Sequence, residues 1–180
     1  MWQQILKYGL IAGLVVAIPM NVMILATPGH LPLAYGMVFG YVTMLVALSA
    51  VFIAIKRYRD GELGGVIGFW PALALGIGIS VIAGIIYSLA WELSLALSHA
   101  DFASAYANTL IAEKKAAGAS AEAIAKLTAE MDAFKVQYAN RLYRMPMTFT
   151  EIFPVGVLVS LISAALLRNR RFLAARPALS

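Results

Sequence analysis

The chain has no cysteine, which excludes disulfides, thiolate metal sites and cysteine nucleophiles. Its two histidines, His30 and His99, leave little material for a metal centre. Charge is also scarce, since 13% of the 180 residues are Asp, Glu, Lys or Arg, against about 25% in soluble domains. Because 62% of the residues are hydrophobic, polar groups cannot cover a water-facing surface. We therefore expect lipid to be the main solvent, and we expect no metal and no cofactor.

Four apolar runs are long enough to cross a bilayer, whose hydrocarbon core of roughly 30 Å needs about 20 helical residues. The third and fourth runs each hold one carboxylate, Glu92 and Glu151, and the first two hold none. The first run is longer than the apolar part of a signal peptide, so we expect it to remain as a span. The sequence predicts an all-α integral membrane protein, a single membrane domain over residues 1–180. Its spans are expected at about 8–27, 33–55, 69–97 and 148–167.

Basic residues collect near the N-terminus, in the second connection and in the tail, three regions that four crossings place on one side. They are Lys7, Lys56, Arg57, Arg59, Arg168, Arg170, Arg171 and Arg176. The short first loop, PGHLP, has no Lys or Arg and is expected to turn tightly. By the positive-inside rule, both termini and the 56–68 connection lie in the cytoplasm.

The charged connection has two interpretations. In the first it is a topology anchor, because long basic side chains at helix ends place their charges among lipid headgroups. In the second it docks a partner protein or an anionic lipid. Either interpretation predicts contacts with headgroups or a partner from Lys56, Arg57, Arg59, Arg168, Arg170 and Arg171.

The third connection, about 99–145, is alanine-rich and polar, unlike the spans. Asp101 and Ser120 are expected to cap two helices separated by Gly118. The second helix carries one apolar stripe at steps of three and four: Ile124, Leu127, Met131, Phe134 and Tyr138. We predict an extracytoplasmic helical hairpin whose stripe packs on its partner helix, the ends of the spans, another subunit or the membrane interface. Its basic and acidic residues nearly balance, so no nucleic-acid surface is expected.

Small residues recur within the spans at helical spacing. Gly9 and Gly13 form one GxxxG motif, and Gly36 and Gly40 form another. In lipid such residues allow two helix backbones to approach closely. We expect contacts within the bundle, and a homo-oligomer seam is the alternative.

Polar residues inside the spans define a candidate polar site consisting of Asn21, Tyr87, Glu92, Arg144 and Glu151. The two carboxylates are expected at a similar depth, and a carboxylate near hydrocarbon needs a partner. We predict that Glu92 or Glu151 pairs with Arg144 or Arg141, with His30 at the same level.

Two members of this candidate site have structural explanations as well. Asn21 follows Pro19, so its amide bonds either locally or to a neighbouring helix, or else belongs to a site. Thr148 and Glu151 have the spacing of a capping box at the start of the fourth span.

Three stretches resemble a known family. The first, IAIKRYRDGELGGVIGFWP, joins the pattern Lys56, Arg57, Tyr58, Arg59 and Asp60 to Gly65 and Phe69. The second, TFTEIFPVG followed by SLISA, holds Glu151, Pro154 and Gly156, and KYGLIAG lies near the N-terminus. Together they resemble the bacterial membrane family known as domain of unknown function 4199. The resemblance implies four spans in a bacterial inner membrane with a helical insert before the last, and it brings no established activity.

Three functions fit these features. The chain shows no nucleophile–base set, zinc motif or phosphate loop, so we expect no enzyme activity. We predict an accessory or scaffold subunit that binds lipids and a protein partner, or a homo-oligomer, through the hairpin and the basic rim. The alternative is a small transporter, channel or lipid-handling protein with an outward-facing polar site around Glu92 and Glu151. In a third hypothesis the chain is an intramembrane enzyme, with Glu92 or Glu151 as base and Arg144 holding a phosphate.

Overall fold

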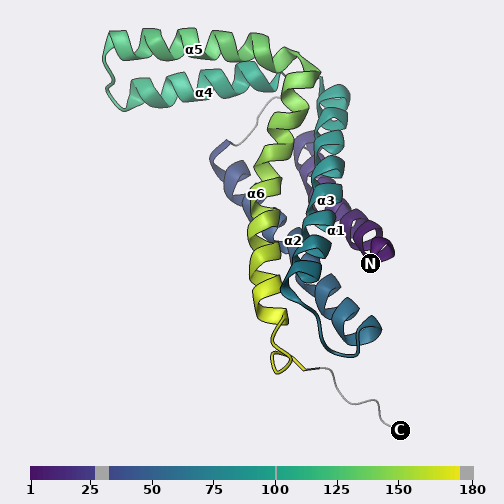
Figure 1. Cartoon of the computed structure of the whole chain (residues 1–180). Helices are drawn as coiled ribbons and strands as arrows, with labels where there is room; N and C mark the ends of the chain where they lie inside the picture. The colour runs from purple at the N-terminus through teal and green to yellow at the C-terminus, as the bar shows by residue number, and fades with distance from the viewer. Residues whose placement is uncertain (27–32, 100, 175–180) are drawn as a thin grey trace.

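The computed structural model of the protein describes residues 1–26, 33–99 and 101–174, and within these ranges it contains six α-helices and no strand. Four long helices form a bundle, and two shorter ones project from one end of it (Figure 1). The helices are α1 (Trp2–Ala26), α2 (Leu33–Glu62), α3 (Phe69–Ser98), α4 (Phe102–Ala116), α5 (Ala121–Ala139) and α6 (Arg141–Leu167). The expected loop around His30 and the tail residue Arg176 lie outside the described residues.

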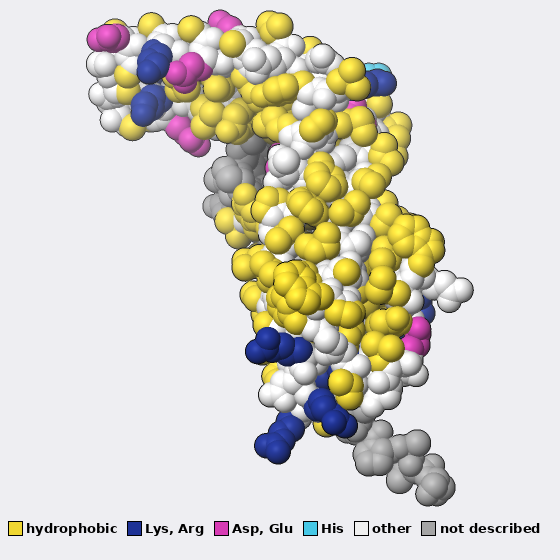
Figure 2. All heavy atoms as spheres, viewed as in Figure 1, with side chains coloured by type: hydrophobic (Ala, Val, Ile, Leu, Met, Phe, Trp, Pro, Cys, Tyr) yellow, Lys and Arg dark blue, Asp and Glu magenta, His cyan; other side chains and the backbone are white. Residues whose placement is uncertain are grey.

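Four of these helices are long and apolar enough to cross a membrane: α1, α2 from Val38 onward, α3 and α6. Their outward faces expose large apolar side chains such as Ile18, Val46 and Leu158, as lipid-facing surfaces do. Figure 2 shows hydrophobic side chains over the visible face of the bundle, with Lys and Arg gathered at its lower end. The predicted all-α membrane architecture with four spans is confirmed.

Three helices extend further than the apolar runs suggested. Helix α1 begins at Trp2 rather than near residue 8, α2 continues past residue 55 to Glu62, and α6 begins at Arg141 rather than at 148. Charged residues continue a helix beyond the hydrocarbon, so hydropathy underestimates its length. The Lys56–Asp60 ion pair, at 2.6 Å and one turn apart, supports such an extension in α2.

The expected capping box at Thr148 and Glu151 is wrong. Asn140 caps α6, since its Oδ1 accepts a hydrogen bond from the backbone N–H of Leu142 at 2.9 Å. Thr148 lies two turns inside the helix, where its hydroxyl donates to the carbonyl of Arg144 at 3.0 Å. Glu151 is therefore free of a capping role.

Close packing through small residues joins α3 to its neighbours. A Cβ on Gly9 would lie 2.6 Å from Ile82, and one on Gly13 would lie 2.7 Å from Ile86, so the first GxxxG motif brings α1 against α3. The second motif does not act in this way, because nothing lies within 4 Å of a Cβ built on Gly40. The expected helix contact at Gly36 and Gly40 is absent from the described part of the chain.

Gly156 of α6 packs against Ser80 of α3 so tightly that a Cβ would lie 2.6 Å from the serine Cβ. We expect Gly156→Ala to cost about 1–3 kcal/mol of unfolding free energy, since neither helix can yield without repacking. Gly40→Ala is the matched control and should cost nothing. Thermal unfolding in detergent measures both, and equal melting temperatures for the two variants would contradict this packing.

Helices α4 and α5 lie side by side and run roughly perpendicular to the bundle (Figure 1). The apolar stripe of α5 packs on α4: the rings of Tyr106 and Phe134 are 5.8 Å apart, and those of Phe102 and Tyr138 are 5.5 Å apart. Of the packing partners considered for the stripe, the structure thus shows the partner helix and, through Tyr138, the end of α3. We call the end of the bundle that carries α4 and α5 the hairpin end, and the opposite end, with residues 56–68 and 168–174, the tail end.

Asp101 and Ser120 cap α4 and α5 as expected, accepting hydrogen bonds from the backbone N–H groups of Ser104 and Ala123. The hydrogen bonds with Ser104 hold the pKa of the Asp101 carboxyl below its ordinary value. Because the folded pKa is lowered, the stabilisation is present at neutral pH and is lost as the pH falls below about 4.

We expect Asp101→Ala to destabilise α4 by about 1 kcal/mol at neutral pH. Hydrogen exchange of the α4 amides measures this. The difference from wild type should vanish at acidic pH, and an undiminished difference at pH 2 would contradict a role for the ionised carboxyl.

Candidate functional site

The residues of the candidate polar site are not brought together. The structure separates them into three groups at the hairpin end: Asn21 between α1 and α3, Glu92 with Arg144 between α3 and α6, and Tyr87 with Glu151 beside a cavity. Each group has its own hydrogen bonds or ion pairs.

Asn21 ties α1 to α3. Its Oδ1 accepts a hydrogen bond from the hydroxyl of Ser94 at 2.7 Å, and its Nδ2 donates to the carbonyl of Ala17 at 3.0 Å. Ser94 is fully buried, and its single hydroxyl proton is shared between Asn21 and the carbonyl of Ala90. The structure thus shows Asn21 bonding both locally and to a neighbouring helix, and all of these partners belong to the protein itself.

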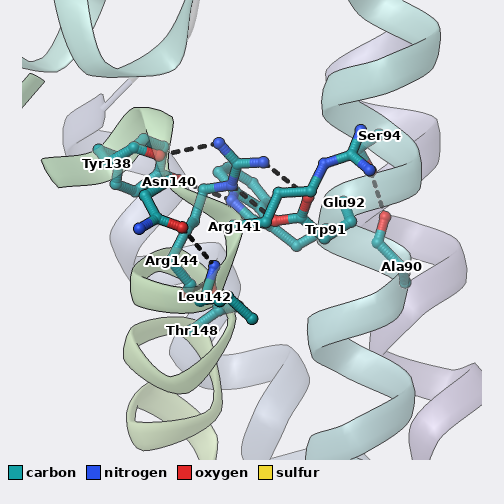
Figure 3. Close-up of polar contacts among 10 residues, drawn as sticks. All are labelled: Ala90, Trp91, Glu92, Ser94, Tyr138, Asn140, Arg141, Leu142, Arg144 and Thr148. Atoms are coloured by element: carbon teal, nitrogen blue, oxygen red, sulfur yellow. Dashed lines mark hydrogen bonds and ion pairs between the residues drawn. The ribbon is translucent and has the colours of Figure 1, made fainter. Parts of the chain in front are cut away.

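Glu92 and Arg144 form the predicted carboxylate–arginine pair (Figure 3). Nε and Nη2 of Arg144 donate to the two carboxylate oxygens, both at 2.6 Å, which is the bidentate geometry of strong arginine pairs. The third nitrogen, Nη1, donates to the carbonyl of Tyr138 at 2.9 Å, and the guanidinium lies over the ring of the same residue. Arg144 therefore fastens the end of α5 to α3.

An aromatic cluster surrounds this pair and fixes the base of the hairpin. The indole N–H of Trp91 donates to the hydroxyl of Tyr138 at 2.7 Å, and the Trp91 ring meets Phe102 edge-on at 5.0 Å. Burial raises the pKa of the Tyr138 hydroxyl above its ordinary value, so it stays neutral. These contacts join the base of the hairpin to α3.

A cavity of about 330 Å³ lies beneath the hairpin, between the four long helices. Its volume is within the range of pockets that hold small ligands, about 300–1,000 Å³. The walls are apolar and aromatic, and among the described residues that line them Glu151 is the one that carries a charge. The lining residues are Val16, Met20, Met23, Ile24, Gly36, Phe39, Gly40, Tyr41, Thr43, Met44, Tyr87, Trp91, Phe102, Tyr106, Phe134, Met147 and Glu151.

Glu151 lines this cavity, and its side chain is not packed into the bundle core. It accepts one hydrogen bond, from the hydroxyl of Tyr87 at 3.1 Å, and no ion pair joins it to any residue that the structure describes. Most of its capacity to accept hydrogen bonds is unused. It differs in this from Glu92, whose two oxygens are both bonded to Arg144.

Sequence reasoning found Tyr87 and Glu151 but missed the rest of the cavity. Phe102, Tyr106 and Phe134 come from the hairpin, and only the tertiary fold places them over the spans. Gly36 and Gly40 were interpreted as a packing motif, although here they leave space. The sequence alone does not distinguish the two roles, since the spacing of the glycines is the same whether or not another helix packs on them.

Arg59, expected at lipid headgroups, is instead completely buried at the tail end. Its guanidinium donates to the carbonyls of Leu167, Phe172 and Leu173 at 3.3, 3.0 and 2.7 Å, and its Nε meets Asp60 at 2.6 Å. The interpretation of Arg59 as a headgroup contact is therefore wrong. The residue folds the segment 168–174 under the bundle.

The other basic residues of the tail end differ in their exposure and in their partners. Lys56 is half-buried and pairs with Asp60, and the exposed Arg57 donates to the hydroxyl of Tyr8 at 3.1 Å. Exposed side chains, which a headgroup contact requires, are therefore those of Arg57, Arg168, Arg170 and Arg171.

Within the described ranges, no three His, Cys, Asp or Glu side chains lie together as metal ligands would. The fold and these sites define a helical membrane protein with four candidate spans and a hairpin-covered cavity. Residues 7–169 match the family described as "Protein of unknown function (DUF4199)". The chain belongs to this family, as its sequence stretches suggested. Searches among curated proteins and among solved structures find no match.

Proposed function

We propose that the protein binds an amphiphilic, lipid-like molecule in the cavity at the hairpin end, without catalysis. The observation that carries this proposal is the cavity itself, whose described lining is apolar and aromatic apart from one carboxylate. An amphiphile matches this combination, because its chain contacts the apolar walls and its head reaches the polar group. This is the lipid-handling form of the alternative that the sequence suggested.

The glycines of α2 support the proposal. Gly36 and Gly40 line the cavity, and a Cβ on Gly36 would meet only the Met23 methyl, at 3.9 Å. A side chain at either position would therefore enter the empty volume without disturbing helix packing. A helix that packed only against lipid would have no need of glycine at this pair of positions.

The proposed location is a bacterial inner membrane, with both termini in the cytoplasm and the hairpin outside. The exposed Arg168, Arg170 and Arg171 at the tail end support it through the positive-inside rule. In this orientation the cavity opens toward the outer leaflet.

The test is native mass spectrometry of the protein extracted from its membrane with co-purified lipid. The wild type should retain a bound amphiphile of defined mass. Gly40→Leu should lose it, because leucine fills the cavity, whereas Gly61→Leu should keep it. Gly61 is a matched control on the same helix, also with nothing within 4 Å. Equal lipid retention by all three proteins would refute the proposal.

The accessory or scaffold role is a second candidate, and exposed apolar side chains at the hairpin end favour it. Val136 of α5 is 76% exposed, and Leu142, in the first turn of α6, is 84% exposed. We expect a photo-crosslinker at Val136, but not one at Glu122, to capture a single protein of reproducible mass in intact cells. Identical patterns from both positions would contradict this role.

A further inference from the structure

We propose that the head of the bound amphiphile carries an ammonium group, which Glu151 recognises. This inference rests on the proposed function and names the class of ligand. A neutral or anionic head would leave the carboxylate unpaired beside an apolar chain, whereas a cation satisfies it.

The depth of Glu151 is the first support. It lies ten residues into α6, about 15 Å along the helix from Arg141. Within a span, an ionisable residue normally has a partner of opposite charge, or it belongs to a binding site. The one described partner of Glu151 is the neutral hydroxyl of Tyr87.

The nearby arginines do not supply the missing charge. Each nitrogen of Arg144 donates a hydrogen bond to a group other than Glu151, two to Glu92 and one to the carbonyl of Tyr138. Arg141 also pairs with Glu92, since its Nε lies 3.6 Å from the Glu92 carboxylate. The two carboxylates at this end thus have different surroundings: Glu92 is neutralised by Arg144, whereas no residue that the structure describes neutralises Glu151.

Aromatic rings provide the second support. Tyr41, Trp91 and Tyr106 line the same cavity as Glu151, together with other aromatic side chains. A ligand cation is attracted to the faces of such rings, most strongly to tryptophan, and aromatic surroundings with a carboxylate are a recurring means of ammonium recognition. An acyl anion would gain nothing from either feature.

The reporter for the test is Trp91, which lines the cavity. The other two tryptophans, Trp2 and Trp70, are 65% and 75% exposed at the tail end, so Trp2→Phe and Trp70→Phe leave one indole at the site. Two brominated probes of equal chain length are titrated in a non-ionic detergent: 12-bromododecylammonium and the neutral 12-bromododecanol. Bromine quenches indole fluorescence on contact, so saturable quenching reports occupancy of the cavity.

We expect the ammonium probe to saturate, and Glu151→Gln to raise its half-saturation concentration by at least about tenfold, the equivalent of one charge-assisted hydrogen bond. Quenching by the alcohol should be the same with either side chain. An ammonium titration unchanged by Glu151→Gln, with Gly40→Leu still abolishing quenching by both probes, would overturn the ammonium inference and leave the cavity function intact. Quenching that neither saturates nor responds to Gly40→Leu would overturn both.

Discussion

Substituting Arg144 by glutamine should lower the free energy of unfolding by about 3 kcal/mol, because breaking a buried ion pair leaves an uncompensated charge. The pair qualifies as nearly buried, since Arg144 and Glu92 are 12% and 15% exposed. The loss should also loosen the hairpin, since Arg144 joins α3 to the end of α5 through Tyr138. Thermal unfolding in detergent and hydrogen exchange along α5 measure the two effects.

Arg141 is the matched control for this prediction. It carries the same charge and lies 3.6 Å from Glu92, but its side chain is 76% exposed. Arg141→Gln should therefore leave the melting temperature close to the wild-type value. The double variant Glu92→Arg with Arg144→Glu, which exchanges the two charges, should recover part of the stability that Arg144→Glu alone loses. If Arg144→Glu is harmless by itself, the pair does not hold the hairpin.

The second large effect is expected at the opposite end of the bundle. Arg59→Leu should release the segment 168–174 and destabilise the fold by about 3–5 kcal/mol, since one buried guanidinium satisfies three carbonyls and a carboxylate. One of these carbonyls belongs to Leu173, whose φ of 48° is a left-handed conformation that a leucine seldom adopts. The hydrogen bond from Arg59 helps to hold that conformation.

Arg57→Leu is the comparison for Arg59, two residues away on the same helix and exposed, with one hydrogen bond to Tyr8. Limited proteolysis distinguishes the two variants: Arg59→Leu should be cut rapidly after Arg168, Arg170 or Arg171, and Arg57→Leu should resist as the wild type does. Equal cleavage of both variants would show that the tail is held by something other than Arg59.

The fold could be predicted because hydrocarbon imposes a simple condition on a chain. Only a helix of about 20 residues satisfies its own backbone across a bilayer, so the length of each apolar run identifies a span. The helix caps at Asp101 and Ser120 could also be predicted from the sequence, since a cap depends on a few neighbouring residues. The end of α2 and the start of α6 could not be predicted in this way, because charged helical turns extend beyond the apolar runs.

The candidate site was predicted less completely, because depth along a helix says nothing about direction around it. Glu92 and Glu151 were placed at one level, but adjacent helix positions point about 100° apart. Trp91 thus faces the cavity while its neighbour Glu92 faces Arg144. The prediction for Arg59 was wrong for another reason. The carbonyls to which it donates lie more than 100 residues later in the chain, and no local sequence pattern indicates such a contact.

That the four long helices cross a bilayer, with the hairpin and the tail on opposite faces, is tested most directly by labelling single cysteines. The chain has none of its own, so Glu122→Cys on the hairpin and Ala174→Cys on the tail report without background. In intact cells or spheroplasts, a membrane-impermeant maleimide should label Glu122→Cys at once, and should label Ala174→Cys only after the membrane is opened. Labelling of both positions from the same side would contradict the proposed arrangement and the placement of the cavity.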